Sequence, residues 1–165
     1  MNSNNVTIKV NLDDHLADFV MNQLGSDKQP VRVVRNHYIG AMLYRLIDKV
    51  PEDCRFTEPV VPGKKQLSLS IGWLGGRSEL RKNPFCYTYF PLSKQREFEN
   101  VIRNSFDLIF FNVIEIAKEY TDEQYKDLIE NFCNRCSINF VKHFDALKKK
   151  HYRARIDFLE KDKKN

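Results

Sequence analysis

Two groups of residues in the last third of this chain have types and spacings that could do chemistry. One is a run of basic side chains that begins at Lys142, and the other is the pair Cys133 and Cys136, separated by two residues. Lysine and arginine neutralise the phosphates of a polyanion, whereas a Cys-x-x-Cys pair can bind zinc or exchange disulfides. The surrounding sequence indicates which of these chemistries applies.

The basic run accounts for the net charge of the whole chain. From Lys142 to the C-terminus there are nine Lys or Arg against four Asp or Glu, a surplus of five, which equals the net charge of +5 on all 165 residues. Phe140, Phe144, Leu147 and Ile156 recur near helical spacing, which predicts a helix with a core-facing apolar side and a basic side in solvent. Such a helix indicates a polyanionic partner. The alternative is an ordinary solvated helix with a lysine-rich end.

A shorter helix is expected immediately before the basic one. Thr121-Asp-Glu-Gln124 matches a capping box, so this helix should start there and run to about Cys136. Ser137 or Asn139 can cap the helix that follows. Two helices joined by three or four residues, the second of them basic, have the outline of a helix-turn-helix, whose second helix lies in the major groove of DNA.

The same residues carry a resemblance to a known group of proteins. The chain has Asp-Ala-Leu-Lys-Lys at residues 145–149 and Tyr-Arg-Ala-Arg at residues 152–155. This pattern resembles the Asp-Ala-Leu-x-Lys and Tyr-Arg-x-Arg segments of helix-turn-helix-like DNA-binding accessory proteins of Bacteroides-group phages and mobile elements. The resemblance covers mainly residues 121–155 and implies a non-enzymatic regulatory or accessory factor that binds double-stranded DNA.

The residues predicted to contact nucleic acid fall into two sets. Those at the start of the second helix are placed to reach base edges, and the later basic residues are placed to meet phosphates. A loop at residues 75–91 adds basic side chains interleaved with aromatic ones, although we favour burial of those aromatics between a helix and a sheet. The predicted binding residues are Asn139, Lys142, His143, Lys148, Lys149, Lys150, Arg153 and Arg155, with Arg77, Arg81 and Lys82 from the loop.

The motifs of catalysis and metal binding are not found in the sequence. No second Cys-x-x-Cys and no His pair follows Cys133 and Cys136 at zinc-finger spacing, so we interpret them as small residues that pack a helix. Neither a Gly-x-Ser-x-Gly nor a His-Glu-x-x-His motif is present. We therefore predict no enzymatic activity, no cofactor, no metal and no small-molecule substrate.

The N-terminal half should hold these helices through a small mixed sheet. Alternation in Val6–Leu12 predicts a half-buried strand, and a helix capped by Asp13 or Asp14 should follow and stop at Gly25. A strand at residues 31–34, a helix at 36–50 and a strand at 66–74 would complete the sheet.

The same beginning permits a different interpretation. A strand, two aspartates and a helix also resemble the opening of ribbon-helix-helix proteins, in which Thr7, Lys9 and Asn11 would face bases. The strand at 31–34 interrupts that pattern, so we favour the mixed sheet.

A long helix at residues 93–120 is apolar on more than one side, which predicts a buried central helix. Its additional apolar side, with Phe110 and Phe111, could instead form a homodimer contact. The fold class expected is α+β, with an α+β part at residues 1–91 and a helical part at 92–165.

Composition sets the remaining expectations. With 42% hydrophobic residues the chain can bury a core, and it contains neither an apolar run of 18 residues nor a signal peptide. We therefore expect a cytoplasmic protein with no membrane partner. RNA could satisfy the same charges as DNA. The alternative function is a protein-interaction or assembly module of a phage or mobile element that does not bind nucleic acid.

Overall fold

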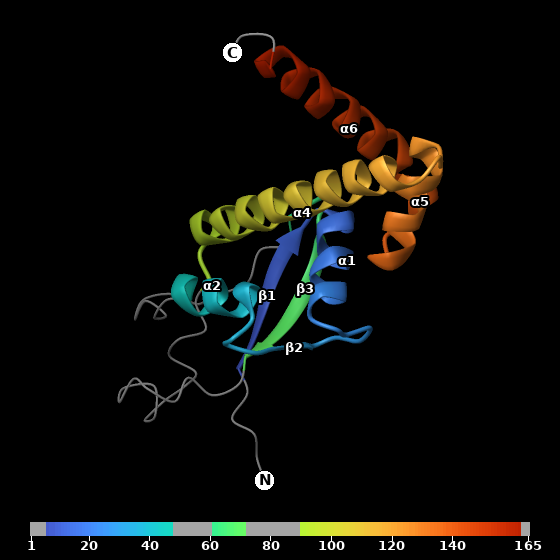
Figure 1. Ribbon diagram of the computed structural model, residues 1–165. Helices are drawn as coiled ribbons and strands as arrows, with labels where there is room; N and C mark the ends of the chain where they lie inside the picture. The colour runs from blue at the N-terminus through green and yellow to red at the C-terminus, as the bar shows by residue number, and fades with distance from the viewer. Residues whose placement is uncertain (1–5, 48–60, 72–89, 163–165) are drawn as a thin grey trace. The chain divides into compact units, whose positions relative to one another are not determined.

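The computed structural model describes residues 6–47, 61–71 and 90–162 (Figure 1). The chain forms two compact units, residues 1–104 and 105–165, here called the N-terminal and C-terminal units. The division falls inside helix α4 (Leu92–Tyr120) rather than at residue 91, because Gln95 and Arg103 of this helix bind residues of the N-terminal unit. In the described part of the chain, no helix combines the length and the apolar character needed to cross a bilayer.

A mixed three-stranded sheet forms the centre of the N-terminal unit. Its strands are β1 (Val6–Leu12), β2 (Val31–Val33) and β3 (Lys65–Ile71). Strand β3 lies in the middle, antiparallel to β1 and parallel to β2. Ile8 pairs with Leu69 and Val10 with Leu67, and all four side chains are fully buried. The predicted α+β fold with a small mixed sheet is confirmed.

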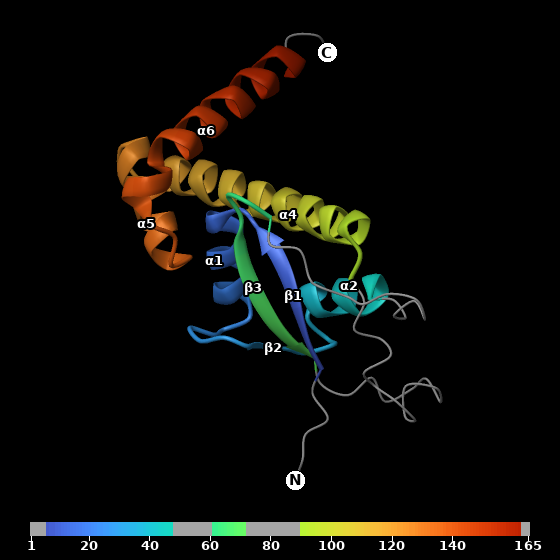
Figure 2. The same cartoon turned by 180° about the vertical axis from the view of Figure 1, so that it is seen from behind.

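Helices α1 (Asp14–Gln23) and α2 (Tyr38–Leu46) lie beside this sheet (Figures 1 and 2). Helix α1 buries Phe19 and ends at Gln23, and Gly25, the predicted stop signal, follows two residues later with a left-handed φ of 63°. The amide of Gly25 donates to the carbonyl of Asn22, and the amide of Ser26 donates to that of Met21. These two bonds form a Schellman motif, which satisfies carbonyls at the end of the helix.

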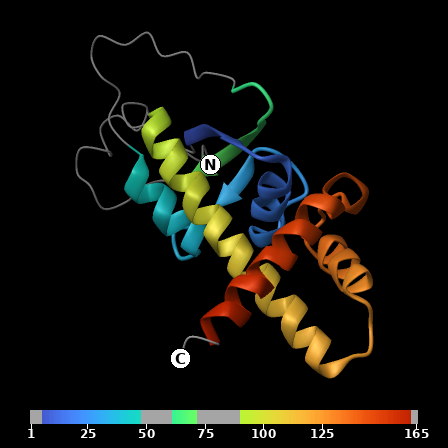
Figure 3. The same cartoon turned by 90° about the horizontal axis from the view of Figure 1, so that it is seen from above.

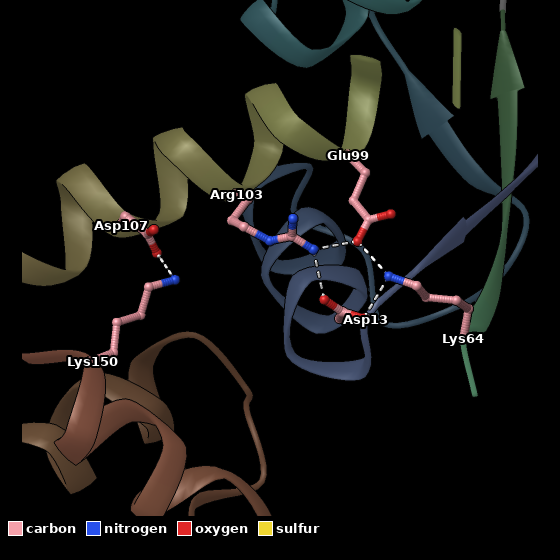
Figure 4. A network of polar contacts seen from close by, with 6 residues as sticks. All are labelled: Asp13, Lys64, Glu99, Arg103, Asp107 and Lys150. Atoms are coloured by element: carbon pink, nitrogen blue, oxygen red, sulfur yellow. Dashed lines mark hydrogen bonds and ion pairs between the residues drawn. The ribbon is translucent and has the colours of Figure 1, made fainter. Parts of the chain in front are cut away.

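Asp13 precedes α1 at the N-cap position, but its carboxylate makes no capping bond. It instead accepts from Lys64 Nζ at 2.7 Å and from Arg103 Nη2 at 2.9 Å, while Glu99 Oε1 accepts from the same two cations at 2.5 Å each (Figure 4). Partial burial alone would raise the pKa of Asp13, but the hydrogen bonds and charges of Lys64 and Arg103 outweigh it and lower that pKa. The cluster therefore joins α1, the start of β3 and α4.

This cluster predicts that acid weakens the N-terminal unit. The pKa of Asp13 is lower in the folded than in the unfolded chain, so its stabilising effect is present above the ordinary value of 3.8 and is lost as the pH falls through the folded value. Because 34% of this side chain is exposed, screening limits the effect to about 1 kcal/mol. Urea midpoints measured by circular dichroism from pH 6 to pH 2.5 should fall less steeply for Asp13→Asn than for wild type. If the urea midpoints of the two proteins fell in parallel with pH, the ion pairs of Asp13 with Lys64 and Arg103 would be contradicted.

Asn11 on β1 is buried, unlike its exposed neighbours Thr7 and Lys9. Its amide nitrogen donates to Gln95 Oε1 at 3.1 Å, and Gln95 Nε2 donates to the carbonyl of Phe90 at 3.0 Å. Asn11 therefore fixes the start of α4 against β1, and it is not placed to face bases as the ribbon-helix-helix interpretation would require.

The C-terminal unit consists of residues 105–120 of α4 with α5 (Tyr125–Arg135) and α6 (Phe140–Asp162), seen from above in Figure 3. Three phenylalanine rings form its core: the Phe132 ring meets Phe110 edge-on at 5.1 Å and Phe106 edge-on at 5.8 Å. Phe110 is fully buried and Phe111 is half-buried. Phe110 is therefore not available for the homodimer contact considered from the sequence, because it fills the core of this unit.

Candidate nucleic-acid interface

The beginning of α5 differs from the prediction. The helix starts at Tyr125, with Gln124 at the N-cap position and no side-chain capping bond. Thr121 does not act as a cap, because its hydroxyl donates to the carbonyl of Ala117 at 2.9 Å, at the end of α4. The predicted capping box was wrong, since the preceding helix provides this threonine with a nearer acceptor.

The turn between α5 and α6 is a second Schellman motif, formed without glycine. Ser137 has a left-handed φ of 56°, and its amide donates to the carbonyl of Asn134 at 3.3 Å. The amide of Ile138 donates to the carbonyl of Cys133 at 2.9 Å, and the Ile138 side chain is buried. Asn139 Oδ1 then accepts from the Lys142 amide at 3.0 Å, which confirms the predicted cap of α6.

The left-handed serine predicts a stabilising substitution. A residue with a Cβ atom is strained in this conformation, whereas glycine is not, so Ser137→Gly should raise the free energy of unfolding by about 0.5 to 1 kcal/mol. Urea unfolding followed by circular dichroism measures the change. Ser137→Ala is the matched control, because it removes the hydroxyl and keeps the strain, and it should not stabilise. If Ser137→Ala raised the free energy of unfolding as much as Ser137→Gly, the left-handed conformation of Ser137 would be contradicted.

The inner side of α6 contains Leu147 and His151, both buried, with Phe144 half-buried beside them. Ile156, which was assigned to the core, is 37% exposed, and Tyr152 is 66% exposed. A helix turns about 100° per residue, so position 156 lies on the side opposite to position 147. The predicted apolar stripe is therefore correct only in its first half.

Two of the predicted binding cations are engaged by carboxylates of α4 within the same unit. Lys150 forms an ion pair with Asp107 (Figure 4), and Arg155 Nε lies 3.9 Å from Glu115 Oε1. The same Glu115 oxygen lies 2.6 Å from His151 Nε2. His151 and Glu115 were not predicted to interact, because residues 36 positions apart give no signal of a contact in the sequence. Lys150, His151 and Arg155 therefore fasten α6 to α4.

Three other predicted binding residues lie on the outer side of α6. Lys142, Lys149 and Arg153 are exposed, and their spacing of seven and four residues places them on one side of the helix. Lys148 is also exposed, with its Nζ 5.7 Å from the centre of the Phe144 ring. His143 is half-buried. The three predicted residues of the loop, Arg77, Arg81 and Lys82, lie outside the described residues.

Cys133 and Cys136 are both buried as free thiols at the end of α5. Burial, with smaller contributions from Cys136 and Glu130, raises the pKa of Cys133 to about 11, and burial also raises that of Cys136. A protonated thiol is a poor nucleophile, so exchange chemistry at neutral pH is disfavoured. The described residues contain no group of three or more His, Cys, Asp or Glu that could hold a metal ion.

The outer side of α6 is thus the candidate interface, and its cations come from one continuous helix. Comparison of the chain with protein-family models, with curated proteins and with solved structures gave no match. The function is therefore inferred from the chain's own side chains, among which the exposed cations Lys142, Lys148, Lys149 and Arg153 are the candidates for ligand contact.

Proposed function

We propose that this protein is a non-enzymatic factor that binds double-stranded DNA through the outer side of α6. The observation that carries the proposal is the exposure of Lys142, Lys149 and Arg153 together on one side of the helix. Exposed cations release counterions when they meet phosphates, which favours binding. The α5–α6 pair would serve as a helix-turn-helix of a regulatory or accessory factor, the class that residues 121–155 resemble.

The length of the basic side fits a short stretch of duplex. Lys142 and Arg153 are eleven residues apart, which corresponds to about 16 Å along a helix, or roughly five base-pair steps. The capping bond occupies the side-chain oxygen Oδ1 of Asn139. The side-chain NH₂ group of Asn139 is therefore the part that could donate to a base edge. Phosphate contacts therefore outnumber base contacts, and we expect affinity with little sequence choice.

The test is a mobility-shift titration of the full chain with a random duplex at several salt concentrations. Three phosphate contacts, made by Lys142, Lys149 and Arg153, predict a slope of about −2.7 in a plot of log affinity against log salt. No shift at low salt would refute the proposal. Competition with double-stranded RNA of the same length separates the two polyanions, because a helix that enters a DNA major groove does not fit the deep, narrow groove of A-form RNA.

Exposed apolar side chains favour a second candidate, a protein-interaction module. Within the C-terminal unit, Leu108 and Ile116 of α4 and Val141 of α6 are exposed, Val141 at 90%. A second copy of the chain or another protein could cover them. Sedimentation at increasing concentration would show self-association, and Leu108→Ser with Ile116→Ser should abolish it. A monomer at all concentrations would exclude the homodimer.

A further inference from the structure

A hollow of about 340 Å³ lies between α5 and α6, and two of the exposed cations discussed above, Lys148 and Lys149, line it. Its lining comes entirely from the C-terminal unit: Tyr125, Ile129, Asp145, Lys148, Lys149, His151, Tyr152 and Arg155. This volume is at the lower end of the range for small-ligand sites. Its size therefore suits a ligand of one or two rings.

The wall of the hollow is an aromatic surface held in place from two sides. The ring of Tyr125 lies 4.8 Å from that of His151, and the Arg155 guanidinium carbon lies 5.0 Å from the centre of the Tyr125 ring. His151 is itself fixed by Glu115. Tyr152 adds a second, largely exposed ring. Because the Tyr125 ring is already contacted by His151 and Arg155, the ring that offers a stacking surface to a planar ligand is that of Tyr152.

The charges around these rings favour an anion. Lys148, Lys149 and Arg155 bring three positive charges to the lining, Asp145 brings one negative charge, and the carboxylate of Glu115 lies 3.9 Å from Arg155, so the surplus is one. This positive surplus attracts a phosphate monoester, which carries about −1.5 to −2 at neutral pH. A planar aromatic group joined to a phosphate satisfies both halves of the site, and this combination is the chemistry of a nucleotide.

We propose that the α5–α6 hollow binds one nucleotide, with its base stacked on Tyr152 and its phosphate against Lys148 and Lys149. The inference deepens the proposed function and rests on it for the source of the nucleotide, which would be an unpaired base at the end of a duplex. A free nucleoside monophosphate has the same chemistry. The experiment below distinguishes the two sources.

The first arm compares a blunt duplex with the same duplex carrying a single-base 3′ overhang. Stacking of the unpaired base should make the overhang bind about tenfold more tightly. Tyr152→Ala should remove this preference without changing blunt-duplex affinity, and Tyr152→Phe should retain it. Tyr120→Ala is the matched control, because Tyr120 is 82% exposed and does not line the hollow.

The second arm titrates deoxyadenosine monophosphate alone and follows the ring resonances of Tyr125 and Tyr152 by NMR. Saturable shifts indicate a free nucleotide as ligand, and shifts with the overhang only indicate the nucleic-acid end. No shift with either probe, or a preference for the overhang that survives Tyr152→Ala, overturns the inference. If the blunt duplex still binds, the proposed function is unaffected by that result. Nucleotide binding without any duplex binding overturns the proposed function alone. Failure to bind any of these probes overturns both.

Discussion

The Lys149→Glu, Arg153→Glu double variant is expected to bind every duplex on the order of 100-fold more weakly than wild type at low salt. Both side chains are exposed on the outer side of α6, so their reversal would remove two of the proposed phosphate contacts and add two repelling charges. The slope of log affinity against log salt should become shallower by about 2. Because phosphates carry no sequence information, the loss should be uniform across sequences.

A charge-matched control separates the interface from the overall charge. Lys28→Glu with Arg32→Glu reverses two exposed cations of the N-terminal unit and, like the α6 pair, lowers the net charge from +5 by four. This control should keep most of the affinity. An equal loss in both double variants would show that general charge drives binding, and unchanged binding of the α6 variant would contradict the proposed interface. Circular dichroism verifies that each variant folds.

Gly40→Ala is expected to be a severely destabilising change in the N-terminal unit. A Cβ atom at position 40 would lie 2.0 Å from the carbonyl oxygen of Val34 and 3.1 Å from Val33 Cγ1. The Val34 carbonyl also accepts from the His37 amide at 3.1 Å, so the backbone before α2 cannot move without losing that bond. The free energy of unfolding should fall by about 3 kcal/mol, measured from urea curves.

Gly25→Ala is the appropriate comparison for this change. Gly25 has a left-handed φ of 63°, but an added Cβ atom would have nothing within 4 Å. The cost is then backbone strain alone, about 1 kcal/mol. If Gly40→Ala costs no more than Gly25→Ala, α2 does not approach Val34 as described.

The elements that depend on local patterns were predictable from the sequence. Strand β1 has the predicted bounds Val6–Leu12, because alternation of apolar and polar residues is a direct consequence of the two faces of a sheet. Helix α4 begins at Leu92, one residue before the predicted start. The prediction was this close because the apolar periodicity continues over a helix of 29 residues. Patterns of this length outweigh individual propensities.

Side-chain caps were harder to predict, because a cap competes with other partners. Asp13 and Thr121 have the residue types that cap helices, yet Asp13 binds Lys64 and Arg103, and Thr121 binds the carbonyl of Ala117. Asn139 caps α6 as predicted. The competing partner of Thr121 lies four residues away, whereas Lys64 lies 51 residues from Asp13, so sequence alone could anticipate only the first.

For the candidate interface, the sequence predicted the helix but not which of its cations are exposed. Apolar spacing identified Leu147 as buried, and rotation by about 100° per residue already places Ile156 on the opposite side. His151 was missed because a search for apolar residues passes over histidine. Which cations remain in solvent depended on Asp107, 43 residues before its partner Lys150, and tertiary structure alone supplies that information.

The half-buried pair of Lys150 and Asp107 has a practical consequence for handling the protein. Dissolved ions screen fully wetted charges much more than sheltered ones, so a concentrated sodium chloride wash should displace a bound polyanion while α6 stays attached. Material stripped in this way from a heparin resin would be folded and ready for titration with a chosen ligand.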